Sequence, residues 1–269
     1  MKDHLRELVD RHEGHANLRL WIAREYLQAR ILQSFQESGA FTEWAFQGGT
    51  ALRFLYSLPR FSEDLDFALV KAGSETRFGS AIERARTTLE AEGYGVAAKV
   101  KEEKTVAAAF LRFAGLPFEL ELSPHSEQVL SVRVELDTNP PAGATLDTTM
   151  VRRHILLNLH HHDRSTLLAG KLHAVLSRPW CKGRDLYDLA WYLSDSTWPE
   201  PNIAFLDAAL RQTGWAGLPV SQVNWRRVTA EKIESLDVRS ALEDVRPFLE
   251  RPADADMVNR DALLRSLKG

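Results

Sequence analysis

The stretch from Phe46 to Phe67, FQGGTALRFLYSLPRFSEDLDF, constrains the fold more than any other part of the chain. The apolar run Trp44 to Gln47 predicts a buried strand, and the two glycines after it are free to adopt positive φ in a tight turn. Thr50 is a good helix N-cap, and the six residues after it favour a helix. Unpaired backbone N–H groups at a helix start can bind an anion, so Gly48, Gly49 and Thr50 predict a phosphate site.

Two carboxylates lie at the start of the next predicted strand, Leu65 to Val70. Asp64 and Asp66, at positions i and i+2, project from the same face of a strand, where their charges repel each other. A strand tolerates such a pair when cations lie between the carboxylates. Mg²⁺ bound by one or two carboxylates and by substrate phosphates is the common solution. The alternative interpretation is a hairpin-like turn and a solvated strand edge that binds nothing.

The order of glycine turn, hydroxyl residue, short helix and D-x-D strand resembles the nucleotidyltransferase superfamily with a DNA polymerase β-type palm. The longer sequence motif, GGTALR followed by RFSEDLDF, is similar to that of the abortive-infection (AbiEii/AbiGii-like) nucleotidyltransferase toxins of bacterial toxin–antitoxin pairs. This resemblance implies an α+β fold, in which a palm with a mixed sheet and flanking helices precedes a mostly helical domain that completes the active site. It also implies that Arg53 and Ser62 contact the nucleotide.

The remaining patterns agree with such a palm. Residues 16–38 have apolar positions at helical spacing and end at Gly39, which predicts an amphipathic helix that covers the sheet. The sequence Asn139-Pro140-Pro141-Ala142-Gly143 interrupts the pattern, so we expect a palm over residues 1–140 and a mostly helical domain over residues 141–269. Further elements are predicted as a helix over 80–92 and strands over 96–100, 106–113, 118–122 and 130–137.

A third carboxylate is expected on a strand after the D-x-D pair, because the family's pattern places one there. In residues 130–137 the polar positions Arg133, Glu135 and Asp137 share one face of the predicted strand. On the resemblance, Glu135 would join Asp64 and Asp66 as a metal ligand. The alternative is an outward polar face on a half-exposed antiparallel strand, which also applies to Glu119 and Glu121.

The second informative stretch covers residues 163–193, DRSTLLAGKLHAVLSRPWCKGRDLYDLAWYL. Lys171 falls within the apolar stripe of a helix capped by Asp163, so its ammonium must reach an anion or water. Asp185, at the start of the next helix, could hold it. The segments KLHAVLSR and RDLYDL match the family's downstream motif. This resemblance implies that Lys171 contacts the nucleotide triphosphate. By the same resemblance, Asp185 or Asp188 would orient Lys171 or assist the incoming hydroxyl; the alternative is an interhelix salt bridge.

Charge and cysteine content exclude several classes of protein. The net charge is −3 with a pI near 6.3, so a nucleic-acid contact must be local rather than spread over the surface. Arg152, Arg153 and Arg164 cluster after the predicted boundary and are expected to bind acceptor phosphates. Three consecutive histidines, residues 160–162, cannot all face one ion, so we expect a solvated loop. Cys181 is the only cysteine, which excludes an internal disulfide.

The sequence shows no apolar leader or bilayer-spanning run, and we expect a cytoplasmic protein without membrane contact. The resemblance implies a Mg²⁺-dependent enzyme with two ions that transfers a nucleoside monophosphate from an NTP to an acceptor hydroxyl. It further implies the 3′ end of a tRNA as acceptor and a cognate antitoxin as protein partner. Two alternatives remain at this point: transfer to a small molecule of the aminoglycoside type, and a catalytically silent nucleotide- or partner-binding module.

Overall fold

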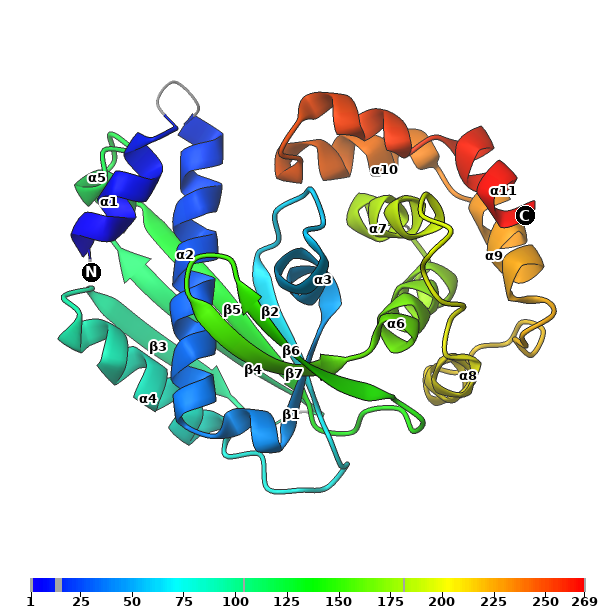
Figure 1. Ribbon diagram of the computed structural model, residues 1–269, viewed down its shortest axis with the longest axis horizontal. Helices are drawn as coiled ribbons and strands as arrows, with labels where there is room; N and C mark the ends of the chain where they lie inside the picture. The colour runs from blue at the N-terminus through cyan, green and yellow to red at the C-terminus, as the bar shows by residue number, and fades with distance from the viewer. Residues whose placement is uncertain (1, 13–15, 104, 181, 269) are drawn as a thin grey trace. The chain divides into compact units, whose positions relative to one another are not determined.

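The computed structural model describes residues 2–12, 16–103, 105–180 and 182–268 (Figure 1). Cys181 lies outside the described residues. The chain divides into two compact units. Unit 1 comprises Met1–Leu55, Phe61–Pro140 and Thr148–His161, and unit 2 comprises Tyr56–Arg60, Pro141–Asp147 and His162–Gly269. A junction therefore falls at residue 140, where the proline- and glycine-containing break lies, but residues 148–161 return to unit 1 and residues 56–60 belong to unit 2.

Unit 1 is built on a mixed sheet, whose strands in the described residues have the order β3-β4-β5-β2-β1-β7-β6. β2 lies at its centre, antiparallel to β1 and parallel to β5, and β1 is parallel to β7. The predicted strands over 44–47, 65–70, 96–100, 106–113 and 130–137 are confirmed with shifts of one residue at their ends. The strands are β1 (Trp44–Gln47), β2 (Asp64–Leu69), β3 (Val96–Lys101), β4 (Val106–Ala114), β5 (Val129–Asp137), β6 (Leu146–Arg152) and β7 (Leu156–His162).

Helices cover one face of this sheet. Helix α2 (Ala16–Glu37) packs on β5 and α4 (Phe78–Ala91) packs on β3 and β4, and Figure 1 shows both on the same side of the strands. Alternate residues of β5 such as Val132 and Val134 are buried beneath them, whereas Arg133 and Glu135 are half-buried on the opposite face. The other helical elements of unit 1 are α1 (Lys2–Asp10), η1 (Ala40–Thr42), α3 (Gly48–Tyr56, whose last residue belongs to unit 2) and α5 (Leu116–Glu119).

One expectation about local structure is wrong. Residues 118–122 form no strand; instead Gly115, with φ 71°, and Pro117 start the short helix α5. Proline suits the first turn of a helix because its missing N–H needs no partner there, and Leu116 and Leu120 are buried. Residues 141–269 are mostly helical, and β6 and β7 precede the helices and extend the sheet.

Unit 2 is built mainly from short helices, and several of them have side-chain caps at their starts. The side chains of Asp163, Asn202 and Asp237 accept hydrogen bonds from backbone N–H groups in the first turns of their helices, which satisfies donors that the helix itself leaves unpaired. The predicted N-cap at Asp163 is confirmed. The helices are α6 (Arg164–Ser177), α7 (Gly183–Leu193), α8 (Ile203–Gln212), α9 (Trp225–Glu234), α10 (Val238–Val245), η2 (Arg246–Phe248), η3 (Pro252–Met257) and α11 (Arg260–Lys268).

Helix α7 starts in direct backbone contact with α10. A Cβ added at Gly183 would overlap the carbonyl oxygen of Ala241 and lie 3.0 Å from the backbone nitrogen of Val245. The Gly183 N–H also donates to Asp244 Oδ2 at 2.8 Å, so the position cannot shift without loss of that bond. Only glycine fits here. The position of α7, which carries Asp185 and Asp188, therefore depends on this contact.

We predict that Gly183→Ala destabilises the protein by about 2 kcal/mol or more, because the methyl group must push two backbones apart. Gly170→Ala is the matched control, since Gly170 also lies in a helix and nothing comes within 4 Å of an added Cβ there. That change is expected to be neutral or to stabilise by up to about 1 kcal/mol. Urea unfolding of both variants measures the difference, and equal effects would contradict the packing argument.

Candidate active site

The glycine turn brings a carboxylate against the start of α3. Helix α3 begins directly at Gly48, which has φ 78°, and a Cβ at this position would collide with Asp66 Oδ2. Glycine is therefore required twice, once for the backbone angle and once for the approach of Asp66. A carboxylate at a helix N-terminus is electrostatically favourable, and the same N–H groups can bind phosphate oxygens. The turn and the D-x-D strand thus form one site.

Asp64 and Asp66 project from the same face of β2, as predicted, and both are half-buried. Asp66 pairs in register with Gln47 of β1 and with Glu135 of β5, and Asp64 pairs with Arg133 of β5. The register therefore places Glu135 beside the carboxylate pair on the sheet. Its own carboxylate forms an ion pair with Arg133.

These residues fit a divalent cation of the Mg²⁺ type. Two half-exposed carboxylates on one strand face, next to a helix start that can take phosphates, supply the oxygen ligands that Mg²⁺ prefers. Within residues 2–12, 16–103, 105–180 and 182–268, however, no group of three or more His, Cys, Asp or Glu side chains is gathered closely enough to hold a metal ion. Asp64 and Asp66 are the residues that would hold the ion, and the part of Glu135 stays a prediction.

Thr50 has a different structural role from the one predicted. It is not the N-cap, because α3 already begins two residues earlier, and its side chain is fully buried. Its hydroxyl donates to the backbone carbonyl of Asp64. This bond ties the first turn of α3 to the strand residue that carries the first carboxylate.

A buried carboxylate that sequence reasoning missed holds α3 in place. Glu25 of α2 is 4% exposed and contacts the guanidinium of Arg53, which is 2% exposed and lies over the Phe61 ring at 3.9 Å. Glu25 Oε1 also accepts from Arg153 Nε and lies close to His154 Nε2, each at 2.8 Å. Burial alone would raise the pKa of Glu25, but the bond with His154 and the charges of Arg53 and Arg153 lower it to about 2.

This cluster bears on three site predictions. Arg53 and Arg153 have a partner inside unit 1, and Arg153 Nη1 also donates to the Arg53 carbonyl oxygen at 3.3 Å. Ser62 is 8% exposed, and its carbonyl accepts from the buried Gln28. Contacts of Arg53 and Ser62 with a nucleotide and of Arg153 with an acceptor stay predictions. The geometry instead makes Arg53 and Arg153 positioning residues for α3.

In unit 2, Lys171 lies between two aspartates of α7. Its Nζ is 2.7 Å from Asp188 Oδ2 and 3.3 Å from Asp185 Oδ1. Asp188 is fully buried and also accepts two hydrogen bonds from Arg60, at 2.6 Å each. Although burial alone would raise it, the charges of Arg60 and Lys171 hold the pKa of Asp188 below its ordinary value. Asp185 has a second partner in Arg178. The interhelix ion pair foreseen for Lys171 is therefore present, with Asp188 as its closer partner.

The other basic and titratable residues lie on different elements. Arg152 is exposed on β6, and Arg164 stacks on the rings of Tyr56 and Trp198 at 4.8 and 5.0 Å. The histidine run forms the end of strand β7 rather than the expected solvated loop. His161 Nε2 lies 2.9 Å from Thr149 Oγ1, and both His161 and His162 are buried.

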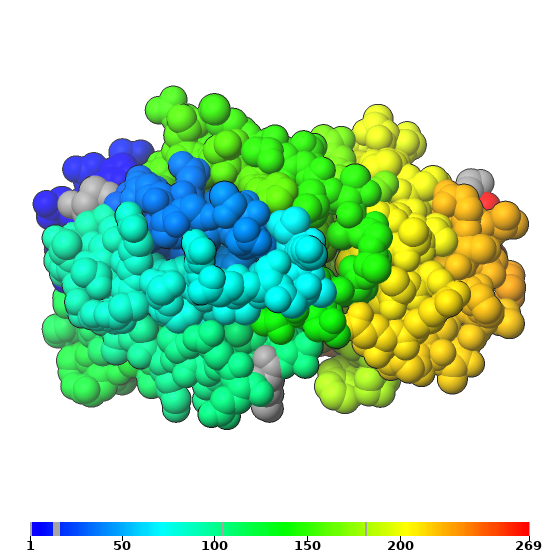
Figure 2. All heavy atoms as spheres, turned by 90° about the horizontal axis from the view of Figure 1, so that it is seen from below, coloured from blue at the N-terminus to red at the C-terminus, as the bar shows by residue number. Residues whose placement is uncertain are grey.

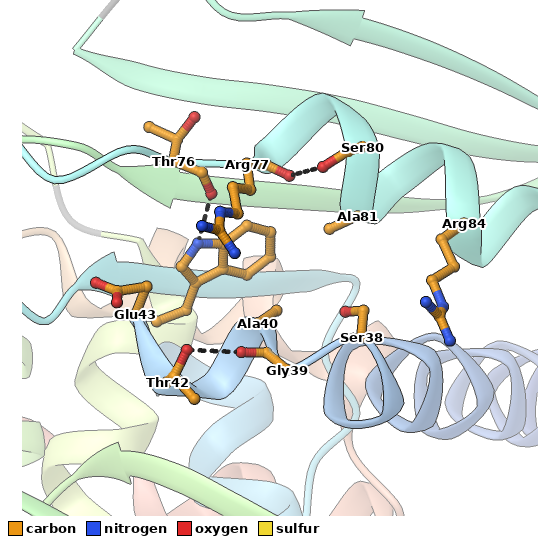
Figure 3. Close-up of a pocket in the computed structure, with 11 residues that line it drawn as sticks. Ser38, Gly39, Ala40, Thr42, Glu43, Thr76, Arg77, Ser80, Ala81 and Arg84 are labelled. Carbon is orange, nitrogen blue, oxygen red and sulfur yellow. Dashed lines mark hydrogen bonds between the residues drawn. The ribbon is translucent and has the colours of Figure 1, made fainter.

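A cavity of about 330 Å³ lies elsewhere in unit 1, between η1 and the start of α4 (Figure 3). Figure 2 shows one face of the molecule, on which blue and cyan residues of unit 1 lie side by side. Figure 3 shows Arg77 and Arg84 on the α4 side and Ser38 and Glu43 on the other. Its wall includes Trp44, which pairs with Leu69 at the end of β1 and β2 remote from Asp66. The cavity is therefore separate from the carboxylates.

A strand, a glycine turn, a helix and paired carboxylates on the adjacent strand are the features on which the resemblance to nucleotidyltransferases rests. A profile of the family described as "Nucleotidyl transferase AbiEii toxin, Type IV TA system" matches residues 30–260. The chain belongs to this family. It is thus a nucleotidyltransferase, and a toxin–antitoxin family implies an antitoxin partner.

Solved structures share the fold. MenT4, a nucleotidyltransferase toxin from Mycobacterium tuberculosis H37Rv, aligns at 18% identity over 98% of this chain and 89% of its own, with a TM-score of 0.56. The JHP933 protein from Helicobacter pylori aligns at 17% identity over 92% and 93%, with a TM-score of 0.53. A putative nucleotidyltransferase from H. pylori aligns at 16% identity over 91% and 95%, with a TM-score of 0.52. No curated protein matches the sequence.

The Glu25 cluster generates a pH prediction. Because the pKa of Glu25 is lowered from 4.5 to about 2, its contribution to stability is complete above pH 4.5 and is lost as the pH falls towards 2. The shift corresponds to about 3 kcal/mol. In urea unfolding, Glu25→Gln should therefore be clearly less stable than the wild type at pH 7, and this difference should shrink between pH 4.5 and 2.

Glu37→Gln, the same change at an exposed position of α2, is the control and should keep the wild-type pH profile. A stability difference between Glu25→Gln and wild type that stays constant with pH would show that folding does not lower the pKa of Glu25.

Proposed function

We propose that this AbiEii-family protein transfers a nucleoside monophosphate from an NTP to the 3′ end of a tRNA and releases pyrophosphate. One observation carries the proposal: Asp64 and Asp66 share one face of β2, and Asp66 lies against the glycine start of α3. Paired carboxylates beside a phosphate-binding helix start are what metal-assisted phosphoryl transfer requires. The tRNA acceptor rests on the resemblance of the sequence motifs to the family.

In this proposal Asp64 and Asp66 hold two Mg²⁺ ions, with Glu135 as the third ligand. Bound there, such ions lower the pKa of the attacking hydroxyl and neutralise charge on the transferring phosphoryl group. The N–H groups at Gly49 and Thr50 bind the triphosphate, and the hydroxyl of Thr50 keeps the backbone of Asp64 fixed to the same turn. Gly48 keeps the space open in which the Asp66 carboxylate lies.

The acceptor would be bound in part by basic residues outside this turn. Arg152 and Arg164 are both exposed, and the stacking of Arg164 on Tyr56 and Trp198 leaves its guanidinium at the surface of unit 2. We propose them as phosphate contacts, with Arg153 at most a secondary one because it is bound to Glu25. No described helix has both the length and the apolar character needed to cross a bilayer. A cytoplasmic site of action is part of the proposal.

We predict that Asp64→Asn and Asp66→Asn each abolish transfer while the protein stays folded. Loss of one ligand removes charge neutralisation that contributes several kcal/mol to the transition state, and loss of one like charge relieves repulsion on β2. The assay is incubation with labelled NTPs and either total tRNA or small hydroxyl acceptors, with and without Mg²⁺. Label on tRNA supports the proposed acceptor.

Glu119→Gln is the control, because Glu119 is a surface carboxylate paired with Lys2 and lies outside the sheet. It should keep wild-type transfer. Label on a small acceptor alone would replace tRNA by that acceptor class, and near-normal NTP turnover by either aspartate variant would refute the metal assignment.

We further propose that Lys171 neutralises the triphosphate, with Asp185 and Asp188 holding it in position. The ion pairs do not exclude this role, since Asp188 keeps two bonds to Arg60 and Asp185 keeps Arg178 when Lys171 turns to a phosphate. Each aspartate thus has a second cation. Lys171 can leave either carboxylate without exposing an unpaired buried charge.

For this reason Lys171→Met should lower stability without ligand by only about 1 kcal/mol. It should also abolish most of the rise in melting temperature that an NTP produces, and slow transfer at saturating acceptor. Arg178→Met is the matched control: it removes the second cation of Asp185, and its response to NTP should stay normal. If NTP stabilises Lys171→Met as much as the wild type, Lys171 does not bind the triphosphate and its role is purely structural.

A further inference from the structure

The face of the sheet that carries Asp64 and Asp66 continues as an open surface toward β3. The register places four residues in one row across the strands: Asp64 pairs with Arg133, Arg133 with Phe110, and Phe110 with Lys99. A neighbouring row runs from Asp66 through Glu135 and Ala108 to Lys101. Because cross-strand partners lie on the same side of a sheet, all these side chains share the face opposite to α2 and α4.

This surface changes from acidic to basic and aromatic with distance from the carboxylates. Lys99, Lys101 and Arg112 are exposed, and Phe110 is 38% exposed. The Arg133 guanidinium lies 5.6 Å from the centre of the Phe110 ring. A shallow hollow of about 370 Å³ is lined by Lys99, Lys101, Phe110, Arg112 and Ser131. Three strand spacings, about 14 Å, separate the row position of Lys99 from that of Asp64.

The positive charge here is not used within the fold. Across the part of the chain that the structure describes, no ion pair forms with Lys99, Lys101 or Arg112. Their concentration contrasts with the whole chain, which carries a net charge of −3. An exposed aromatic ring among unpaired cations contributes nothing to the stability of the fold if the surface faces only water. It is the combination by which proteins bind single-stranded nucleic acid, since bases stack on the ring and phosphates meet the cations.

We propose that the single-stranded end of an RNA acceptor crosses this face, with one base stacked on Phe110 and backbone phosphates on Lys99, Lys101 and Arg112. The path leads along the rows toward Asp64 and Asp66, so the 3′ hydroxyl arrives at the carboxylates while the preceding nucleotides lie over β4 and β3. A few nucleotides cover the distance. This inference rests on the proposed nucleotidyl transfer to RNA and specifies where that RNA binds.

The test measures binding of a fluorescent single-stranded RNA with a free 3′ hydroxyl, without NTP, by anisotropy over a range of KCl concentrations. Lys99→Ser with Lys101→Ser should weaken binding and flatten the slope of log affinity against log salt by about 1.4, since each lost phosphate contact on a single strand contributes about 0.7. Phe110→Ala should weaken binding about tenfold, and Phe110→Tyr should restore it. The KM for NTP should be unchanged in every variant.

Lys71→Ser with Arg84→Ser is the matched control, because it removes two exposed charges of the same sign elsewhere in unit 1 and should leave the salt slope near the wild-type value. If the wild type labels RNA while the Lys99/Lys101 variant keeps its RNA affinity and slope, the proposed path is overturned and the proposed function stands. If the wild type labels no RNA, the proposed function itself fails. Unchanged RNA binding combined with weaker binding of the antitoxin would overturn the path and assign this face to a protein partner.

Discussion

The carboxylate of Glu25 is the interaction on which the arrangement of unit 1 depends. It contacts Arg53 of α3 and both Arg153 and His154 of the segment between β6 and β7, so two stretches distant in sequence meet α2 at one buried point. A buried charge is costly unless it is paired, and four ionisable groups in one place must therefore stay together. Because α3 cannot move relative to α2, its first turn stays where Asp66 needs it.

The strand register then places the two aspartates beside the start of this fixed helix. The pairing of β2 with β1 and β5 sets Asp66 between Gln47 and Glu135, and a slip by one residue would turn both aspartates to the helix-covered face. The sheet thus separates two environments. One face is apolar and covered by α2 and α4, and the other carries Asp64, Asp66 and Glu135 together with the cations and the Phe110 ring to which we assign RNA binding.

Sequence reasoning predicted the strand, glycine turn, helix and D-x-D strand because each has strong local signals: glycines, alternation and helix formers. It also predicted that Lys171 pairs with an aspartate of the next helix, since the charge of a lysine within an apolar stripe needs an anion as partner. It missed Glu25 because a single glutamate on an amphipathic helix looks like a solvated residue, and its partners lie 28 to 129 positions away. It misassigned residues 118–122 because alternation of apolar and polar residues outweighed the helix signal of Pro117.

Arg60 has a consequence for how this protein can be divided. It lies four positions before Asp64, yet its guanidinium is enclosed in unit 2 by Asp188. A fragment that ends at residue 140 would keep the whole D-x-D motif, but Arg60 would lose Asp188, the carboxylate that neutralises its charge. A single crossover near the proline- and glycine-containing break therefore cannot exchange either unit for a homologous one, because residues 56–60, between α3 and the D-x-D strand, belong to unit 2.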